Sequence, residues 1–345
     1  MLNWSKPKPF LDGATYHTSQ KCSAGGVGRN LADGLLKLHG NVKLISKVGA
    51  DKNGESLLNS LSEDCRNLME IDTMAPTATC AVVFDSLGDS KLILANMQIH
   101  ETITSDMILR NEQTIAQAPV IVFDGNIPID TMATILELCR KYKKPAFFEP
   151  TDMMIATKPF NLPSELVNQI KFISPNIYEL NAIAEHINLP KIIDTTETSI
   201  DHLFEKDSDL LMKITATTTQ IIKHIDCDVI LTLGSRGILM MTTKRSSGNM
   251  KILNNKITSN KLRCKIHNRF YGVNPVMDVV NVSGAGDSFN VGFITAMIRG
   301  YDEEICVSVG LESARTALKS SSAVPSAYFK SNHPCWTQAA TYKDI

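Results

Sequence analysis

The segment Val279–Gly300 holds the residues of this sequence whose types and spacing best suit chemistry. Between a strand-like run and an apolar helical pattern it places Ser283, Gly284, Ala285, Gly286 and Asp287. Glycine permits a tight turn, and the unpaired N–H groups at the start of a helix attract an anion. A carboxylate at that point can accept the proton of an attacking hydroxyl while the backbone stabilises phosphoryl charge. The segment therefore suits phosphoryl transfer, although a turn that Asp287 merely caps would have the same sequence.

A second glycine-rich segment, Ser23–Gly40, places Gly25 and Gly26 ahead of a helical pattern with Asn30 in its first turn. Such a loop lets a ligand hydroxyl approach the backbone, and an Asn side chain offers a polyol both a donor and an acceptor. The alternative is a helix start with small packing residues. The run GGVGRN is not G-x-G-x-x-G, and Gly49–Ser56 has Glu55 where a P-loop needs lysine, which disfavours dinucleotide oxidoreductases and P-loop enzymes.

Composition excludes several other classes of protein. The 345 residues, 43% hydrophobic and 21% charged, suffice for one large or two modest globular domains. A formal charge of -1 provides no field that would attract nucleic acid or an anionic membrane. The eight cysteines form no C-x-x-C pair and the histidines no H-E-x-x-H, which disfavours zinc sites. No apolar run approaches the ~20 residues that span a bilayer, and the first ten residues do not resemble a signal peptide, so we expect a cytoplasmic protein with reduced cysteines.

Short apolar runs alternate with helical patterns, which predicts a mostly parallel sheet covered by helices. The expected strands are Val42–Ser46, Val120–Phe123, Ala146–Phe148, Phe172–Ser174, Val229–Leu233 and Met277–Val280. The expected helices are Arg29–Leu38, Thr131–Tyr142, Tyr178–His186, Ser288–Arg299 and Glu303–Lys319. Two strand-like runs between Thr77 and Thr104 flank a Gly-Asp turn and predict a hairpin lid. The polar stretches Lys191–Thr219 and Thr242–Asn274 are expected to be surface insertions.

Four motifs, in order along the chain, resemble those of the PfkB (ribokinase-like) carbohydrate kinases. GGVGRN and NVSGAGDSFNVGF resemble the family's two signatures, SPNIYEL its N-x-x-E motif and TLGSRG its nucleotide loop. The resemblance extends from Asp12 to about Ser326. Within the family, the sequence is most similar to the pseudouridine kinases in four features: GGVGRN, VFDGNIP, FFEPTD and Asn281.

The resemblance implies a single α/β domain over residues 1–345, a ribokinase-like α/β/α sandwich with a small β lid from segments 11–23 and 77–104. It implies transfer of the ATP γ-phosphoryl group to a nucleoside or sugar hydroxyl, most specifically the 5'-hydroxyl of pseudouridine, with Asp287 as general base. Gly284, Ala285 and Gly286 would form the anion hole, and Asp12, Gly25, Gly26 and Asn30 would bind the small-molecule acceptor. ATP would contact Asn176, Glu179, Thr232, Gly234, Ser235, Gly237 and Ser313. Asn176 and Glu179 would organise Mg²⁺ through water.

Two departures from the family pattern, and one ambiguous residue, leave alternatives open. The strand that normally opens the family's central sheet, and that ends in the sugar-binding Asp, has no counterpart before Asp12, where proline and lysine abound. A non-catalytic relative that binds nucleotide therefore remains an alternative, as does a ribokinase or adenosine kinase specificity. Asn281 replaces an acidic residue at a monovalent-cation position, where its amide oxygen could still bind K⁺. Glu149 is either a second carboxylate near the phosphates or a surface acid at a strand end. An apolar lid face would favour a homodimer.

Overall fold

The computed structural model describes residues 2–4, 18–20, 22–84, 90–194, 200–243 and 266–345. It divides into two compact units. Unit 1 contains Met1–Gly25 and Lys43–Ile103, and unit 2 contains Gly26–Val42 and Thr104–Ile345. Asp12, the Gly88–Asp89 turn and most of the expected lid segment 11–23 lie outside the described residues.

Unit 1 contains a four-stranded sheet in the order β2-β1-β5-β6. Its strands are β1 (Leu2–Trp4), β2 (Thr18–Gln20), β5 (Thr79–Phe84) and β6 (Ser90–Asn96). β5 and β6 form the predicted antiparallel hairpin, with Thr79 opposite Asn96, and β1 pairs parallel to β5. A strand thus exists close to the start of the chain, where composition predicted none, and it belongs to this small sheet.

The other elements of unit 1 surround a two-stranded parallel sheet. They are β3 (Lys47–Gly49), β4 (Glu70–Asp72), α2 (Lys52–Ser60), α3 (Glu63–Arg66) and the 3-10 helix η1 (Gln98–Thr102). The predicted strand Val42–Ser46 is wrong, because the strand begins only at Lys47. The N–H of Leu44 bonds to the carbonyl of Cys65. Cys65 belongs to helix α3, so this bond is not part of a β-sheet.

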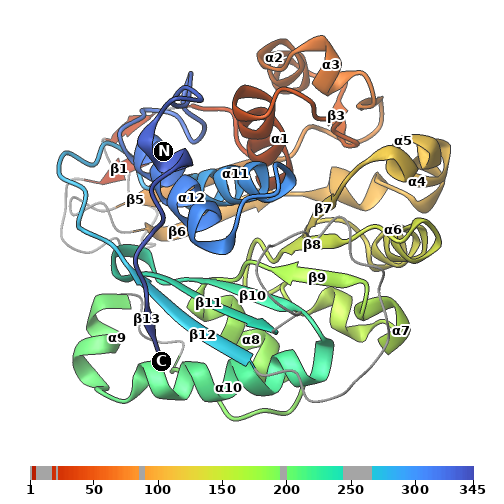
Figure 1. The fold of residues 1–345 in the computed structure, drawn as a ribbon. Helices are drawn as coiled ribbons and strands as arrows, with labels where there is room; N and C mark the ends of the chain where they lie inside the picture. Colours follow the sequence, from red (N-terminus) through yellow and green to blue (C-terminus); the bar gives the residue numbers. More distant parts are fainter. Residues whose placement is uncertain (1, 5–17, 21, 85–89, 195–199, 244–265) are drawn as a thin grey trace, which may run out of the picture. The chain divides into compact units, whose positions relative to one another are not determined.

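Unit 2 is built on a seven-stranded sheet in the order β13-β12-β11-β10-β9-β8-β7 (Figure 1). Its strands are β7 (Ile121–Asp124), β8 (Ala146–Glu149), β9 (Ile170–Ile173), β10 (Asp228–Thr232), β11 (Gly237–Thr243), β12 (Ile266–Gly272) and β13 (Lys343–Asp344). β7 to β10 run parallel, as predicted from apolar runs without alternation, and β11 to β13 add antiparallel pairs.

Helices cover both faces of this sheet. Phe147, Phe172 and Ile230 point to a core shared with the long helices α1 (Val27–Leu38), α11 (Ala285–Ile298) and α12 (Glu303–Leu318). α8 (Ile177–His186) and α10 (Leu210–Ile225) pack against β10 on the opposite face, so that α10 and α11 lie on different sides in Figure 1. The remaining helices are α4 (Ser105–Arg110), α5 (Glu112–Gln117), α6 (Ile129–Tyr142), α7 (Ser164–Val167), α9 (Ile200–Lys206), η2 (Lys158–Asn161), η3 (Gly234–Arg236) and η4 (Pro334–Trp336).

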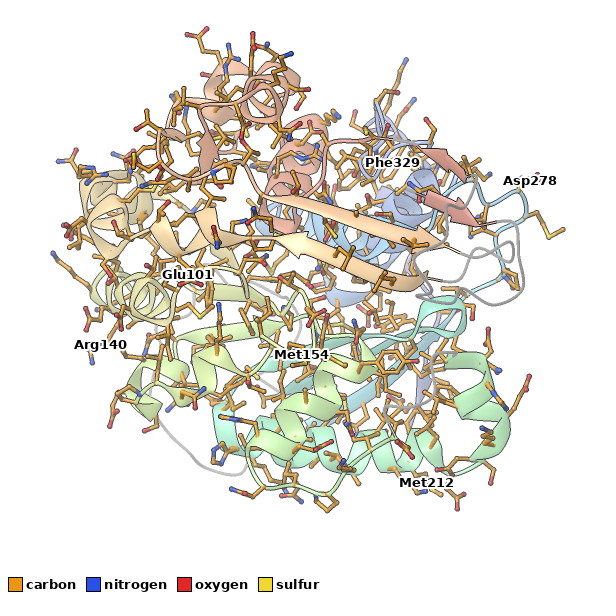
Figure 2. The ribbon with its side chains drawn as sticks, turned by 180° about the vertical axis from the view of Figure 1, so that it is seen from behind. Glu101, Arg140, Met154, Met212, Asp278 and Phe329 are labelled. Carbon is orange, nitrogen blue, oxygen red and sulfur yellow. The ribbon has the colours of Figure 1, made fainter. Side chains whose placement is uncertain are left out.

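Three further expectations for unit 2 are wrong. Met277–Val280 is an exposed bend rather than a strand, because Val280 N–H bonds to Leu318 O at the end of α12 and Asp278 has a φ of 62°. Figure 2 shows Asp278 at the periphery of the molecule. Lys191–Thr219 is not merely a surface insertion, since it includes the start of α10 with buried Leu210 and Ile214. Thr242–Asn274 likewise contributes β12 to the sheet. In the part of the chain that the structure describes, no helix is long and apolar enough to span a membrane.

The close contact between α11 and α12 fixes the helix whose first turn is Gly284–Asp287. A methyl group on Gly292 would lie 2.5 Å from the Val309 carbonyl oxygen and 2.8 Å from Gly310 Cα. Gly310 in turn faces the ring of Phe289, where a methyl group would lie 2.8 Å from ring carbon Cε2. The two helices therefore touch through glycine, and backbone atoms cannot yield as a flexible side chain can.

We expect Gly292→Ala to lower the free energy of unfolding by about 2–3 kcal/mol, because the added methyl group overpacks this contact. Urea denaturation followed by circular dichroism measures the change. Gly286→Ala is the matched control on the same helix, since its methyl group would meet no atom within 4 Å. A Gly292→Ala protein as stable as the control would contradict the role assigned to this contact.

Candidate functional site

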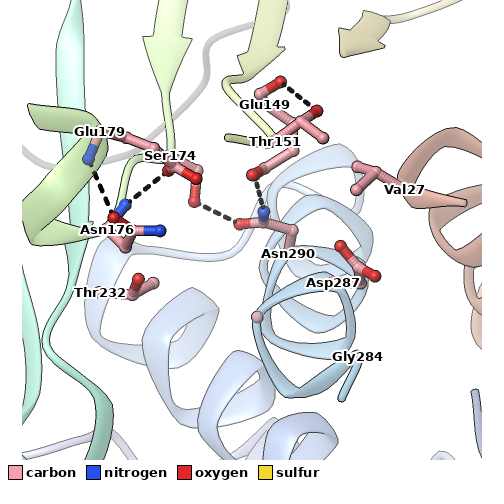
Figure 3. A pocket seen from close by; sticks show the side chains of 11 residues that line it. Val27, Glu149, Thr151, Ser174, Asn176, Glu179, Thr232, Gly284, Asp287 and Asn290 are labelled. Atoms are coloured by element: carbon pink, nitrogen blue, oxygen red, sulfur yellow. Dashed lines mark hydrogen bonds between the residues drawn. The ribbon is translucent and has the colours of Figure 1, made fainter. Parts of the chain in front are cut away.

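Unit 2 contains a cavity of about 170 Å³ at the carboxyl ends of its parallel strands. This volume far exceeds the ~10–15 Å³ that one water molecule needs. Its walls come from the ends of β8, β9 and β10 and from the first turns of α1, α8 and α11 (Figure 3). The lining residues are Val27, Glu149, Thr151, Ser174, Asn176, Glu179, Thr232, Gly284, Gly286, Asp287 and Asn290. Ligands of open α/β sheets bind at this edge, and three helix N-termini there favour an anion.

The turn before α11 offers backbone donors to this cavity. Gly284 has a φ of 79°, and a side chain at this position would collide with the Ala323 carbonyl oxygen. Only glycine fits there. Among the described residues, the N–H groups of Gly284, Gly286 and Asp287 have no hydrogen-bond acceptor, whereas Ala285 N–H bonds to Val282 O at 3.3 Å. The donors available to an anion are therefore those of Gly284, Gly286 and Asp287, and the expected donor of Ala285 is already engaged.

Asp287 lies in the first turn of α11 and is half-buried. Asn30 Nδ2, from the first turns of α1, donates to Asp287 Oδ2 at 2.6 Å. Desolvation raises the pKa of Asp287 to about 6, the Asn30 hydrogen bond opposes that rise, and the charge of Asp124 adds to it. A carboxyl group with this pKa is ionised at neutral pH yet basic enough to accept a proton.

Asn176 and Glu179 form a capping box at the start of α8. Asn176 Oδ1 accepts from the N–H groups of Tyr178 and Glu179 at 2.9 and 3.0 Å, and Glu179 Oε2 accepts from Asn176 N–H at 2.8 Å. Glu179 is only 3% exposed, and desolvation raises its pKa to about 7. The bonds of this box hold a buried carboxyl group at the cavity wall. Thr232 lies beside it, since its N–H bonds to Pro175 O at 2.9 Å.

Glu149, the last residue of β8, is the second buried acid of the cavity rather than a surface group. Asn290 Nδ2 donates to Glu149 Oε2 at 2.6 Å, and Ser174 Oγ donates to Asn290 Oδ1 at 2.7 Å. Desolvation raises the pKa of Glu149 well above its ordinary range, and the negative charges of Glu179 and Asp287 raise it further. The hydrogen bonds fix this carboxyl group in position without adding any positive charge to it.

The carboxyl groups at the cavity suit a hard cation only in one coordination mode. The described part of the chain holds no cluster of three or more His, Cys, Asp or Glu side chains that could bind a metal ion directly. Mg²⁺ often keeps several waters and binds through one or two carboxylates together with substrate phosphates. Glu179 and Glu149 fit that mode. Asn176 fits less well as a ligand, because both lone pairs of its side-chain oxygen accept N–H groups.

Several predicted site residues do not line the cavity. Ser313 is fully buried in α12 and donates its hydroxyl to Val309 O at 2.8 Å. Ser235 is exposed and donates to Asp201, with Gly234 and Gly237 on either side in the η3 turn. Asn281 accepts from Ser283 N–H at 3.0 Å. Gly25 belongs to unit 1, while Gly26 is the N-cap of α1 in unit 2.

Sequence reasoning missed Ser174, Thr151, Asn290 and Val27. Asn290 follows Asp287 by three residues, which places both on one helix face, and this spacing could have revealed it. Ser174 directly follows β9 and precedes the N-x-x-E motif. Thr151 has a φ of 72°, a strained conformation for a β-branched residue that no sequence pattern indicates.

Comparison with known proteins identifies the family and the fold of the chain. Residues 8–328 match the pfkB family carbohydrate kinases. A pseudouridine kinase of Arabidopsis thaliana is 25% identical over 340 residues, covering 91% of this chain and 87% of the relative. A ribokinase of the same plant is 24% identical over 310 residues, covering 88% and 69%. The structure of Arabidopsis thaliana ribokinase complexed with ribose and ATP superimposes with a TM-score of 0.69 at 19% identity, over 94% of this chain and 92% of that one. The fold is ribokinase-like, and the chain belongs to the pfkB family of carbohydrate kinases, which are phosphotransferases that act on a hydroxyl group.

Proposed function

We propose that this sugar or nucleoside kinase transfers the γ-phosphoryl group of ATP to the 5'-hydroxyl of pseudouridine, with Asp287 as the general base. One observation carries the proposal. A carboxyl group whose pKa suits proton transfer shares a cavity with three unpaired N–H donors at a helix start. This combination suits the phosphoryl-transfer reaction, which needs a proton acceptor and stabilisation of developing negative charge.

In this mechanism the acceptor hydroxyl lies against Asp287. The carboxylate takes the hydroxyl proton as the oxygen forms its bond to the γ-phosphorus, and the bond from phosphorus to the ADP oxygen breaks. The N–H groups of Gly284, Gly286 and Asp287 stabilise the negative charge on the transferring group. Mg²⁺, when bound with ATP, would neutralise phosphate charge, with Glu179 and Glu149 holding its water shell. Asn176 would act by positioning Glu179.

Pseudouridine is proposed as the acceptor because of the named relatives and because of the sequence motifs that resemble those of pseudouridine kinases. Relatives named pseudouridine kinase come from Arabidopsis thaliana and Escherichia coli, the latter 29% identical over 167 residues. Ribose is the second candidate acceptor, because relatives named ribokinase cover 87% or more of this chain in several species. The choice between them depends on substrate contacts that an assay must identify.

The proposal is tested by coupled ADP production with pseudouridine, uridine, adenosine and ribose at equal concentrations. We expect pseudouridine to give the highest kcat/KM, and omission of Mg²⁺ to abolish turnover. A higher kcat/KM with ribose would change the proposed substrate but not the proposed phosphoryl-transfer reaction. If calorimetry detected ATP binding but no acceptor gave ADP, the chain would be a nucleotide-binding relative without kinase activity.

We expect Asp287→Asn to lower kcat by about a hundredfold or more, because it removes the proton acceptor. In the unmodified protein, kcat/KM should fall about tenfold per pH unit well below pH 6, where Asp287 becomes protonated. Steady-state kinetics between pH 5 and pH 9 measure both effects. Asp130→Asn, a change of an exposed acid in the first turn of α6, is the control and should leave kcat unchanged. Full activity of the Asp287→Asn protein would assign the base to another group.

The same carboxyl group should destabilise the folded protein at neutral pH. Folding raises the pKa of Asp287 from 3.8 to about 6. The folded state therefore binds this proton more tightly than the unfolded chain, so stability decreases as the pH rises between these two values and the full cost applies above pH 6. A difference of about two pH units corresponds to at most about 3 kcal/mol.

Asp287→Asn should therefore increase the free energy of unfolding by up to about 3 kcal/mol at pH 7 and change it little at pH 4. The neutral amide avoids the desolvation cost, and its oxygen can still accept from Asn30. Urea denaturation at both pH values measures the difference, with Asp130→Asn as the control. An equal effect at pH 4 and pH 7 would mean that the desolvated charge is not its cause.

A further inference from the structure

Arg29 approaches the proposed base through Asn30. Its Nη2 atom donates to Asn30 Oδ1, and Asn30 Nδ2 donates to Asp287 Oδ2 at 2.6 Å. The Arg29 side chain is 11% exposed and that of Asp33, which accepts from Nη1 at 3.3 Å, is 9% exposed. These four side chains form a chain of contacts that leads from α1 to the first turn of α11.

The chemistry of the three groups fixes the orientation of the amide. A guanidinium group only donates hydrogen bonds and an ionised carboxylate only accepts them. Because Asn30 lies between the two, its oxygen must face Arg29 and its NH₂ group must face Asp287. Each of the two contacts alone favours this orientation, and together they hold the amide from both sides. Without Arg29 the amide would be held only by Asp287, and its oxygen would lose its donor.

The orientation also distinguishes the two oxygens of Asp287. Oδ2 is occupied by the Asn30 amide, while in the described part of the chain Oδ1 has no hydrogen-bond partner. A proton taken from an alcohol would therefore go to Oδ1. The carboxylate selects the NH₂ group of Asn30, and Arg29, by donating to the amide oxygen, helps to hold that group against Oδ2.

The start of α1 is itself held in place. Gly28 N–H donates to Asp124 Oδ2 at 3.0 Å, and a methyl group on Gly28 would lie 3.0 Å from the same oxygen. Near the end of α1, Lys37 Nζ donates to Asp33 Oδ2 at 2.9 Å and to Pro325 O at 3.1 Å. Arg29 therefore extends from a backbone that is anchored on both sides, as precise positioning requires.

We propose that Arg29 is a positioning residue for phosphoryl transfer: it orients Asn30 so that the amide holds Asp287 Oδ2 and leaves Oδ1 for the alcohol. This role rests on the proposed function, but the orientation itself does not. Arg29 also places a positive charge near Asp287, which opposes protonation of the carboxylate. The other ionisable groups whose charges interact with Asp287 are Asp124 on β7, Glu149 on β8, Glu179 on α8 and Tyr328 in the C-terminal segment. Arg29 is the cation of this set.

The test compares Arg29→Met, which removes charge and donors, with Arg29→Lys, which keeps the charge and one donor group. Arg315→Met, at a surface arginine of α12, is the matched control. The pKa of Asp287 is measured by NMR in protein labelled with ¹³C at the aspartate carboxyl carbon, with Asp287→Asn identifying the signal. We expect a pKa of about 6 in the unmodified protein and in the control, a higher pKa in Arg29→Met, and a smaller change in Arg29→Lys.

Kinetics provide the second readout. We expect Arg29→Met to lower kcat/KM for the acceptor on the order of tenfold at pH 7, to move the acidic limb of the pH profile upward and to leave the KM for ATP unchanged. Arg29→Lys should recover most of the loss. If Arg29→Met fails to fold by circular dichroism, Arg29→Gln replaces it, because it still donates to Asn30 without charge and should raise the pKa of Asp287 similarly.

The two proposals fail in different ways. An unchanged Asp287 pKa and an unchanged acidic limb in the uncharged variants would overturn the role of Arg29, even in an active kinase. If instead the pKa rises in the uncharged variants while no acceptor is phosphorylated by the unmodified protein, the orientation of Asp287 by Arg29 is supported and the kinase proposal fails.

Discussion

The site depends on one physical constraint: three carboxyl groups must remain largely out of water at the mouth of one cavity. Desolvation is the largest cause of the raised pKa of each, for Asp287, Glu149 and Glu179 alike. Each is held by a donor from a different partner, Asn30, Asn290 or the Asn176 backbone. These donors are neutral, so they hold each acid in place without neutralising it. The raised pKa values favour protonation of these acids, and an incoming cation would favour their ionised forms.

That arrangement can persist only if the helix carrying Asp287 is rigid. The close contact at Gly292 and Gly310 brings α11 against α12, and buried Phe289 and Phe293 anchor α11 in the core beneath the sheet strands. The turn at Gly284 is confined by the backbone of Ala323. Helix packing away from the cavity therefore determines where the N–H donors of the α11 turn point. At each of these close contacts glycine is needed because a side chain would collide with its neighbour.

The sequence predicted the buried strands and the long helices correctly. It failed for features that depend on hydrogen bonds between residues far apart in the chain. β7 to β10 and helices α1, α6, α8, α11 and α12 were anticipated within a few residues, because continuous apolar runs and helical spacing are local signals. Met277–Val280 is also a short, mostly apolar run, yet its backbone bonds to the end of α12, a distant partner that composition does not indicate. The contact of Asn30 with Asp287 joins residues 257 positions apart, and no spacing rule in a single chain indicates it.

The structural and chemical interpretations of these motifs are not alternatives. The N-x-x-E motif is a helix cap, since Asn176 Oδ1 and Glu179 Oε2 both accept backbone N–H groups. The same bonds place the Glu179 carboxyl group at the cavity, where it is 3% exposed. Asn30 is likewise a bridge between two helices and a partner of the proposed base. In each pair the Asn residue helps to hold a carboxyl group, Asn176 through its backbone N–H and Asn30 through its side-chain NH₂ group. Both Asn residues therefore set the geometry of an acid, and in the proposed mechanism the acid held by Asn30 accepts the proton.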